Sequence, residues 1–153
     1  MSRRDLIRMT DEEIEAYLLG RHTMNIATIG PDGSIHLVAM WYGFIGANPA
    51  FATYQRSQKV LNVERDARIT ALVETGETYD ELMGVELVGT AKIHTDDAVK
   101  RELAKSVATR YFGVEDGPEL ELAMEPLVNK RVAIEIVPSK VVSWDHHKLG
   151  GVY

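Results

Sequence analysis

Three strand-like stretches follow one another in the first third of the chain, and only short turns separate them. The stretch Met24-Asn-Ile-Ala-Thr-Ile-Gly30 is rich in β-branched residues and has no helical period. A Pro31-Asp-Gly33 turn leads into the stretch 35–45, and Gly46-Ala-Asn-Pro49 leads into the stretch 50–54. The first two stretches therefore predict a β-hairpin. Because strands and helices do not alternate regularly, the pattern argues against a parallel Rossmann-type sheet.

The rest of the chain adds further strands and most of the helices. Strand-like patterns cover residues 67–74, 84–94, 131–138 and 140–144, and helical patterns cover residues 10–20, 57–66, 96–111 and 118–128. Gly89 predicts a bulge or a close approach of the backbone, and Thr10 with Glu13 forms a capping-box pattern. Pro126 is expected to bend or divide the last helix. The sum predicts a mainly β fold with helices (α+β): a single domain over residues 1–153, built as an antiparallel barrel of about six strands with peripheral helices.

The composition excludes several classes of function. The net charge of −6 and the pI of about 5.4 argue against binding to nucleic acid or to an anionic membrane, because both need a basic surface. Without cysteine, the chain has no disulfide, zinc thiolate or cysteine nucleophile. The N-terminal residues lack the apolar core of a signal peptide, and no stretch approaches the roughly 18–20 apolar residues of a membrane span. We therefore expect a cytoplasmic protein without a nucleic-acid or membrane partner.

The stretch 53–66 carries the strongest signal for a binding site. Ser57 stands just before a helical pattern, so its side chain is expected to cap that helix. The apolar face of the helix is Val60, Leu61 and Val63. Free backbone N–H groups and the positive end of the helix dipole suit a phosphate or carboxylate at this point, and Arg56 and Lys59 add two cations. The alternative is a surface helix whose cations are only solvated.

The stretch Val38-Ala-Met-Trp-Tyr-Gly-Phe44 is a second candidate. A barrel strand so rich in methionine and aromatic residues usually fills a core. If a flat ring cofactor binds here, the strand backbone can meet the ring edge, and Trp41 or Tyr42 can line its face.

The C-terminal stretch 143–151 is a third candidate, because it carries Trp144, Asp145, His146 and His147. Adjacent histidines point apart on a strand, and no third ligand has a helpful spacing, so we expect no metal site. A segment that packs over the edge of a cofactor is favoured instead. The chain also lacks a G-x-S-x-G, an H-E-x-x-H and a P-loop motif, so hydrolytic catalysis has little support.

As an ensemble, these stretches resemble the pyridoxamine-5′-phosphate-oxidase-like split β-barrel flavoproteins. Within them, they resemble the actinobacterial flavin/deazaflavin oxidoreductases that use coenzyme F420. The resemblance extends from about residue 10 to residue 149 and is carried by the stretches 24–33, 37–44, 57–70, 85–91 and 141–149.

The resemblance implies a six-stranded split barrel that forms a homodimer, with two cofactor sites in the grooves between protomers. The strand Val38–Met40 then runs along the ring system, and the C-terminal tail 145–153 packs over the groove. Thr53, Ser57 and Lys59 hold the phosphate. The full set of cofactor-binding residues expected from the sequence is Val38, Ala39, Met40, Trp41, Thr53, Arg56, Ser57, Gln58, Lys59 and Trp144.

The implied activity is hydride transfer from F420 to a small conjugated organic substrate, and no residue is assigned as a catalytic acid. Relatives often have an arginine at the position of Leu61 or Ser57, whereas here the positive charge falls on Arg56 and Lys59. F420 carries an anionic polyglutamate tail, while FMN needs only one phosphate pocket, so both cofactors stay open. The alternatives are an FMN-dependent oxidoreductase and a flavin- or deazaflavin-binding protein without turnover.

Overall fold

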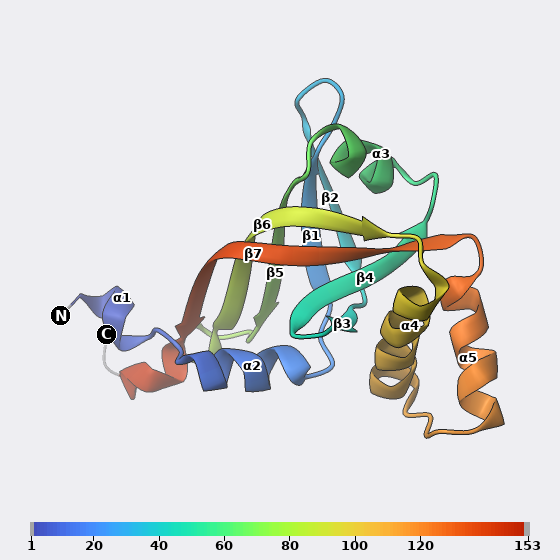
Figure 1. Cartoon of the computed structure of the whole chain (residues 1–153). Helices are drawn as coiled ribbons and strands as arrows, with labels where there is room; N and C mark the ends of the chain where they lie inside the picture. The colour runs from blue at the N-terminus through green and yellow to red at the C-terminus, as the bar shows by residue number, and fades with distance from the viewer. Residues whose placement is uncertain (1, 152–153) are drawn as a thin grey trace.

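A single curled antiparallel sheet of seven strands forms a half-barrel in the computed structural model, which describes residues 2–151 (Figure 1). The strand order across the sheet is β2-β1-β5-β6-β7-β4-β3. The strands are β1 (Met24–Ile29), β2 (Ile35–Met40), β3 (Gly43–Ile45), β4 (Asn48–Tyr54), β5 (Arg68–Thr75), β6 (Met83–His94) and β7 (Arg131–Asp145). This architecture is the predicted split barrel, with one strand more than the six expected.

The helices lie at the ends and on one side of the sheet (Figure 1). They are α1 (Arg3–Leu6), α2 (Asp11–Leu19), α3 (Gln58–Arg65), α4 (Asp97–Phe112) and α5 (Pro118–Val128), with short 3₁₀ turns η1 (Tyr79–Glu81) and η2 (His146–Leu149). The predicted capping box of α2 is present, because Thr10 Oγ1 accepts from the Glu13 amide and the Glu13 carboxylate accepts from the Thr10 amide. None of the described helices is long and apolar enough to cross a membrane.

The additional strand arises because the predicted strand 35–45 is interrupted after Met40. Tyr42 turns fully into the interior, and its hydroxyl donates to the Leu18 carbonyl at 2.6 Å. Trp41 and Tyr42 therefore leave the ladder, β2 ends at Met40, and β3 starts at Gly43. The prediction of one long strand was wrong at this point, because the buried hydrogen bond of a tyrosine is stronger than the local strand propensity.

Pro138 and Pro126 do not divide the elements that contain them. The stretches 131–138 and 140–144 form one strand, because Pro138 lies opposite Gly89 where the ladder shifts register, with Ser139 as the extra residue of β7. Pro126 does not divide α5, which continues to Val128. Pro126 lies in the last turn, and the carbonyl that it leaves without an intrahelical donor belongs to Leu122 on the exposed face.

The main core fills the concave side of the sheet. Inward-facing side chains of β1, β5, β6 and β7 pack there with Val60 and Val63 of α3 and Leu18 of α2. A second cluster on the outer side of β4 and β7 receives Leu103, Val107 and Tyr111 of α4, and α5 packs on α4. The end of β4 and the start of α3 therefore rest on buried structure, which holds Thr53 and Ser57 in fixed positions.

Candidate cofactor site

The end of β4 and the start of α3 bring three of the sequence-predicted residues together. Thr53 is buried, and its hydroxyl accepts from the Lys59 ammonium at 3.0 Å. The Ser57 hydroxyl lies 3.2 Å from the same oxygen. This arrangement joins the hydroxyls of a strand end and a helix start to one ammonium group.

Ser57 stands at the N-cap of α3, as predicted, but the predicted side-chain cap is wrong. Its hydroxyl makes no bond to the helix backbone and contacts Thr53 instead. The first intrahelical bonds run from Val60 and Leu61 to the Ser57 carbonyl. The amides of Gln58 and Lys59 therefore keep the unpaired N–H groups that every helix start presents, beside the positive end of the helix dipole.

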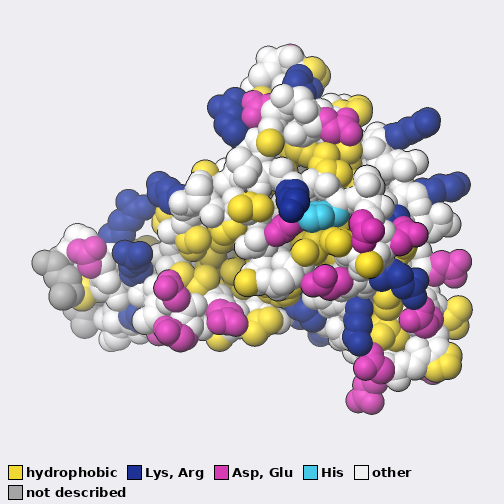
Figure 2. Space-filling view, viewed as in Figure 1, with side chains coloured by type: hydrophobic (Ala, Val, Ile, Leu, Met, Phe, Trp, Pro, Cys, Tyr) yellow, Lys and Arg dark blue, Asp and Glu magenta, His cyan; other side chains and the backbone are white. Residues whose placement is uncertain are grey.

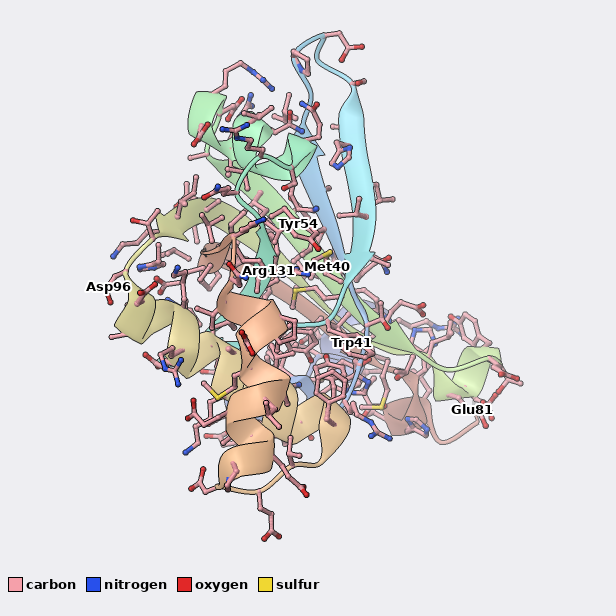
Figure 3. The ribbon with its side chains drawn as sticks, turned by 90° about the vertical axis from the view of Figure 1, so that its right-hand side faces the viewer. Met40, Trp41, Tyr54, Glu81, Asp96 and Arg131 are labelled. Atoms are coloured by element: carbon pink, nitrogen blue, oxygen red, sulfur yellow. The ribbon has the colours of Figure 1, made fainter. Side chains whose placement is uncertain are left out.

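Arg131, which the sequence analysis missed, adds a second cation. It is the first residue of β7 and pairs with Tyr54 across the β4–β7 ladder. Its guanidinium lies 4.4 Å from the centroid of the Tyr54 ring, and its Nε donates to the Pro126 carbonyl at 2.7 Å. Figure 3 shows Tyr54 and Arg131 next to each other. No local pattern marks Arg131, because only the pairing of two distant strands brings it to this point.

Burial and the second cation both disfavour the protonated form of Lys59. Partial burial lowers the pKa of Lys59 below its usual 10.5, and the nearby positive charge of Arg131 lowers it further. Among the described residues no carboxylate contributes to that pKa. Ammonium, guanidinium, two hydroxyls and two free amides thus form a set rich in donors and lacking a counter-charge. Such a set fits the phosphate of a nucleotide-like cofactor.

The other predicted polar residues of this stretch lie away from the donor set. Arg56 is exposed. Gln58 Nε2 donates to Asn62 Oδ1 at 2.8 Å, and Asn62, fully buried, donates to Thr28 Oγ1 at 3.0 Å. Arg65 reaches the Ile29 carbonyl, so it also ties α3 to β1. Asn62 is a second residue that the sequence analysis missed, and its role is to fix the helix that carries Lys59.

β2 has an open edge. It is the end strand of the sheet and pairs only with β1, so its other edge carries unpaired backbone N–H and C=O groups. Val38 and Met40 point into the barrel and pack against the core, whereas Ala39 is exposed. The sequence predicts that this strand contacts a flat ring. The backbone edge of β2 and Ala39 are free to make that contact.

Trp41 follows directly after β2 and is held in an aromatic cluster. Its indole stacks on the Tyr111 ring, with centroids 4.8 Å apart, and meets Phe112 edge-on at 5.5 Å. The guanidinium of Arg110 fixes this corner by donating to the Tyr42 and Gly20 carbonyls. Trp41 remains about half exposed, so one side of the indole is accessible beyond the end of β2 (Figure 3).

Within one chain, Trp144 lies away from the other residues that the sequence predicts to bind the cofactor. It lies near the end of β7, which starts at Arg131, so about 40 Å of strand separate the two. Its indole covers Gly84 on the neighbouring strand, where an added Cβ would lie 2.2 Å from the ring. The adjacent His147 contacts the Asp145 carboxylate at 2.8 Å. No group of possible metal ligands occurs among residues 2–151, and residues 152–153 of the predicted tail lie outside the described chain.

Comparisons with known proteins identify the family and the fold. The family model described as pyridoxamine 5′-phosphate oxidase matches residues 10–145. No functionally curated protein matches significantly. The crystal structure of the conserved hypothetical protein Rv2991 from Mycobacterium tuberculosis is similar, with a TM-score of 0.93 and 38% identity over 100% of this chain and 95% of that one.

More distant structures share the fold with different functions. An F420 reductase has a TM-score of 0.62 and 22% identity over 83% of this chain and 94% of its own. The heme storage protein HutZ from Vibrio cholerae has a TM-score of 0.67 and 11% identity over 88% of this chain and 96% of its own. Both are similar in fold alone.

Proposed function

Because the chain belongs to the pyridoxamine 5′-phosphate oxidase family, we propose that it is an oxidoreductase that holds a flavin-type cofactor in a groove between two copies of itself. The observation that carries the proposal is the donor set around Lys59. Two cations without a counter-charge, two hydroxyls and a helix start converge there, on a rigid strand end. A phosphate neutralises such a set and accepts its hydrogen bonds.

The outer face of the sheet supports a homodimer. On that face Leu37, Ala27, Thr70 and Val88 form one row across β2, β1, β5 and β6. Ile35 and Leu37 are 65% and 64% exposed, although both are large and apolar. An edge strand with such a face is a surface that a second copy covers, because exposed apolar surface of this extent is unfavourable in water.

A two-fold partner also explains why Trp144 stands so far from Lys59. Trp144 has its neighbours Val142 and Leu72 on the same outer face, together with Ile7 and Arg4 of the N-terminal segment. In a dimer formed through that face, Trp144 and the tail that follows it contribute to the groove of the partner. The cofactor-binding set is then shared between protomers, with the phosphate end supplied by one chain.

The chain's own residues bind and orient the cofactor. Lys59, Arg131 and the amides of α3 fix the phosphate, and the free edge of β2 fixes the ring system beside it. When bound, the reduced ring supplies a hydride to the substrate. Trp41, which is half exposed beyond the end of β2, would lie beside the ring. No residue needs to act as a general acid in this arrangement, since solvent can deliver the proton.

We favour F420 as the cofactor because the sequence resembles the F420-using branch, and an F420 reductase shares the fold. The substrate is then a small conjugated organic compound. FMN is the alternative, and one observation favours it. Within residues 2–151, Lys59 and Arg131 are the two cations at the proposed phosphate position, because Arg65 and Arg68 are bonded to Ile29 and Asp66. One phosphate is enough to neutralise that pair.

Titration of the purified apoprotein with FMN and with F420 tests the proposal. We expect saturable binding of F420, monitored by cofactor fluorescence, and oxidation of reduced F420 by a conjugated acceptor such as menadione. Tight FMN binding without F420 binding selects the FMN alternative. Binding without oxidation selects the cofactor-binding protein without turnover, and failure of both cofactors to bind rejects the proposal.

A further inference from the structure

A cavity of about 460 Å³ lies between α2, the β3–β4 hairpin and the bend of β6 and β7. Figure 2 shows its position as hydrophobic surface bordered by acidic side chains along α2. It includes Asn48 and Pro49 at the start of β4, whereas Thr53 stands near the other end, about 17 Å along the strand. The cavity is therefore separate from the donor set around Lys59.

The cavity is the incompletely filled mouth of the half-barrel. Leu87 and Val141 form a cross-strand pair, and Leu87 is buried in the core. Val141 is nevertheless 40% exposed, because α2 does not reach over it. Ile14 and Leu18 of α2 and Phe44 of β3 supply most of the remaining apolar wall. Mouths of barrels are common sites for small molecules, and this volume lies in their usual range.

The polar groups at the cavity are acceptors. Asp11 and Glu15 lie one turn apart on α2, and neither forms an ion pair within residues 2–151. Two nearby donors already have partners: the Gly46 amide donates to Glu102 at 3.0 Å, and Asn48 Nδ2 donates to Glu135 at 2.7 Å. A ligand that complements this lining has an apolar body and a positively charged donor.

Glu15 is the stronger anchor of the two carboxylates. Asp11 lies in the first turn of α2, where the helix dipole partly offsets its charge. Glu15 lies one turn further along and has no such offset, since the effect falls off within the first turn.

We propose that the barrel mouth is a second binding site, which takes a small organic cation with an apolar body, such as an aromatic or alkyl amine. The apolar walls hold the body, and Glu15, assisted by Asp11, holds the ammonium group at the rim. The site is independent of the flavin-type cofactor, so an amine binds to the apoprotein.

Calorimetric titration with a matched series tests this site. The probes are 2-naphthylmethylamine, the neutral 2-naphthalenemethanol and the anionic 2-naphthoate, which share one ring system. We expect the amine to bind about tenfold more tightly than the alcohol at low salt and the anion not to bind. Added salt should reduce the difference between amine and alcohol, because the rim is open to solvent.

Variants separate the cavity from nonspecific attraction to an acidic protein. Glu15→Gln should bring the amine to the affinity of the alcohol, whereas Glu12→Gln on the same helix, outside the cavity lining, should not. Val141→Trp should abolish binding of the amine and of the alcohol, because the indole fills the mouth. If Val141→Trp does not fold, Ala47→Trp at the opposite rim replaces it in the test.

Three results would overturn the proposal. They are equal binding of amine and alcohol to the unmodified protein, equal effects of the Glu15 and Glu12 variants, and unchanged amine binding after the mouth is filled. A change of sedimentation coefficient in Val141→Trp would identify a second copy of the chain as the occupant and would also overturn it.

Discussion

Lys59 is the residue on which the cofactor site depends most. Its ammonium is partly buried, donates to Thr53 and faces the positive charge of Arg131. In the apoprotein this pair is unfavourable, because like charges repel and burial removes water. An anionic ligand offsets the repulsion between the two cations. Binding therefore stabilises a charge pair that is unfavourable in the apoprotein.

Replacement of Lys59 by alanine should weaken cofactor binding by about 1.5–3 kcal/mol, the range for a hydrogen bond to a charged group. Arg56→Ala is the matched control, since Arg56 precedes the same helix but is exposed, and it should change the affinity by less than about 0.5 kcal/mol. Fluorescence titration of FMN or F420 measures both. Equal affinities of the two variants and the unmodified protein would mean that the phosphate binds elsewhere.

The lowered pKa of Lys59 gives a pH dependence with a defined sign. Only the protonated ammonium attracts a phosphate, so affinity is high below the pKa of Lys59 and falls as the pH rises through it. Because burial and Arg131 lower this pKa, the fall should begin below 10.5, the usual value for lysine. A titration series at increasing pH checks this, and Lys59→Arg should move the fall to higher pH, since arginine keeps its charge. Constant affinity up to pH 10.5 would contradict the assignment.

At the scale of elements, the backbone of β7 approaches Gly89 of β6 closely, at the bulge where Ser139 is the extra residue of β7. A Cβ on Gly89 would lie 2.1 Å from the Val137 carbonyl oxygen, which is backbone and cannot turn aside. Gly89→Ala should therefore destabilise the protein by about 3 kcal/mol, the upper range for overpacking. Gly33→Ala, in an open turn with φ of 82°, should cost only about 1 kcal/mol for its left-handed backbone. Urea denaturation measures both, and equal costs would contradict the packing argument.

Some features of these elements can be predicted from the sequence, and others cannot. The cap at Thr10, the close backbone approach at Gly89 and most of the strands are marked by the local sequence, so local patterns predict them. The break after Met40 depends on a hydrogen bond from Tyr42 to a helix that is distant in sequence. Arg131 reaches the site through strand pairing. These contacts depend on tertiary structure, and a propensity or a spacing cannot report them.

For the molecule as a whole, the different surfaces have different tasks. The open edge of β2 and the start of α3 suit a cofactor, the barrel mouth under α2 suits an amine, and the outer face of β2, β1 and β5 suits a second copy. The first and third surfaces meet at β2, because its backbone edge and its outward side chains belong to one strand. Cofactor binding and dimerisation should therefore be coupled, whereas amine binding should not depend on either.

A charge on the outer face tests this coupling. Leu37→Asp places a carboxylate on the exposed side of β2, where the partner chain would bury it, and should shift the protein from dimer to monomer. Sedimentation velocity measures the shift, and titration should show a parallel loss of cofactor affinity of at least about tenfold, because the groove loses the residues of the partner. Leu122→Asp is the control, since Leu122 is 71% exposed on α5, away from β2, and it should change neither property. If Leu37→Asp yields a stable monomer that binds the cofactor at full affinity, the site belongs to one chain and the shared groove is wrong.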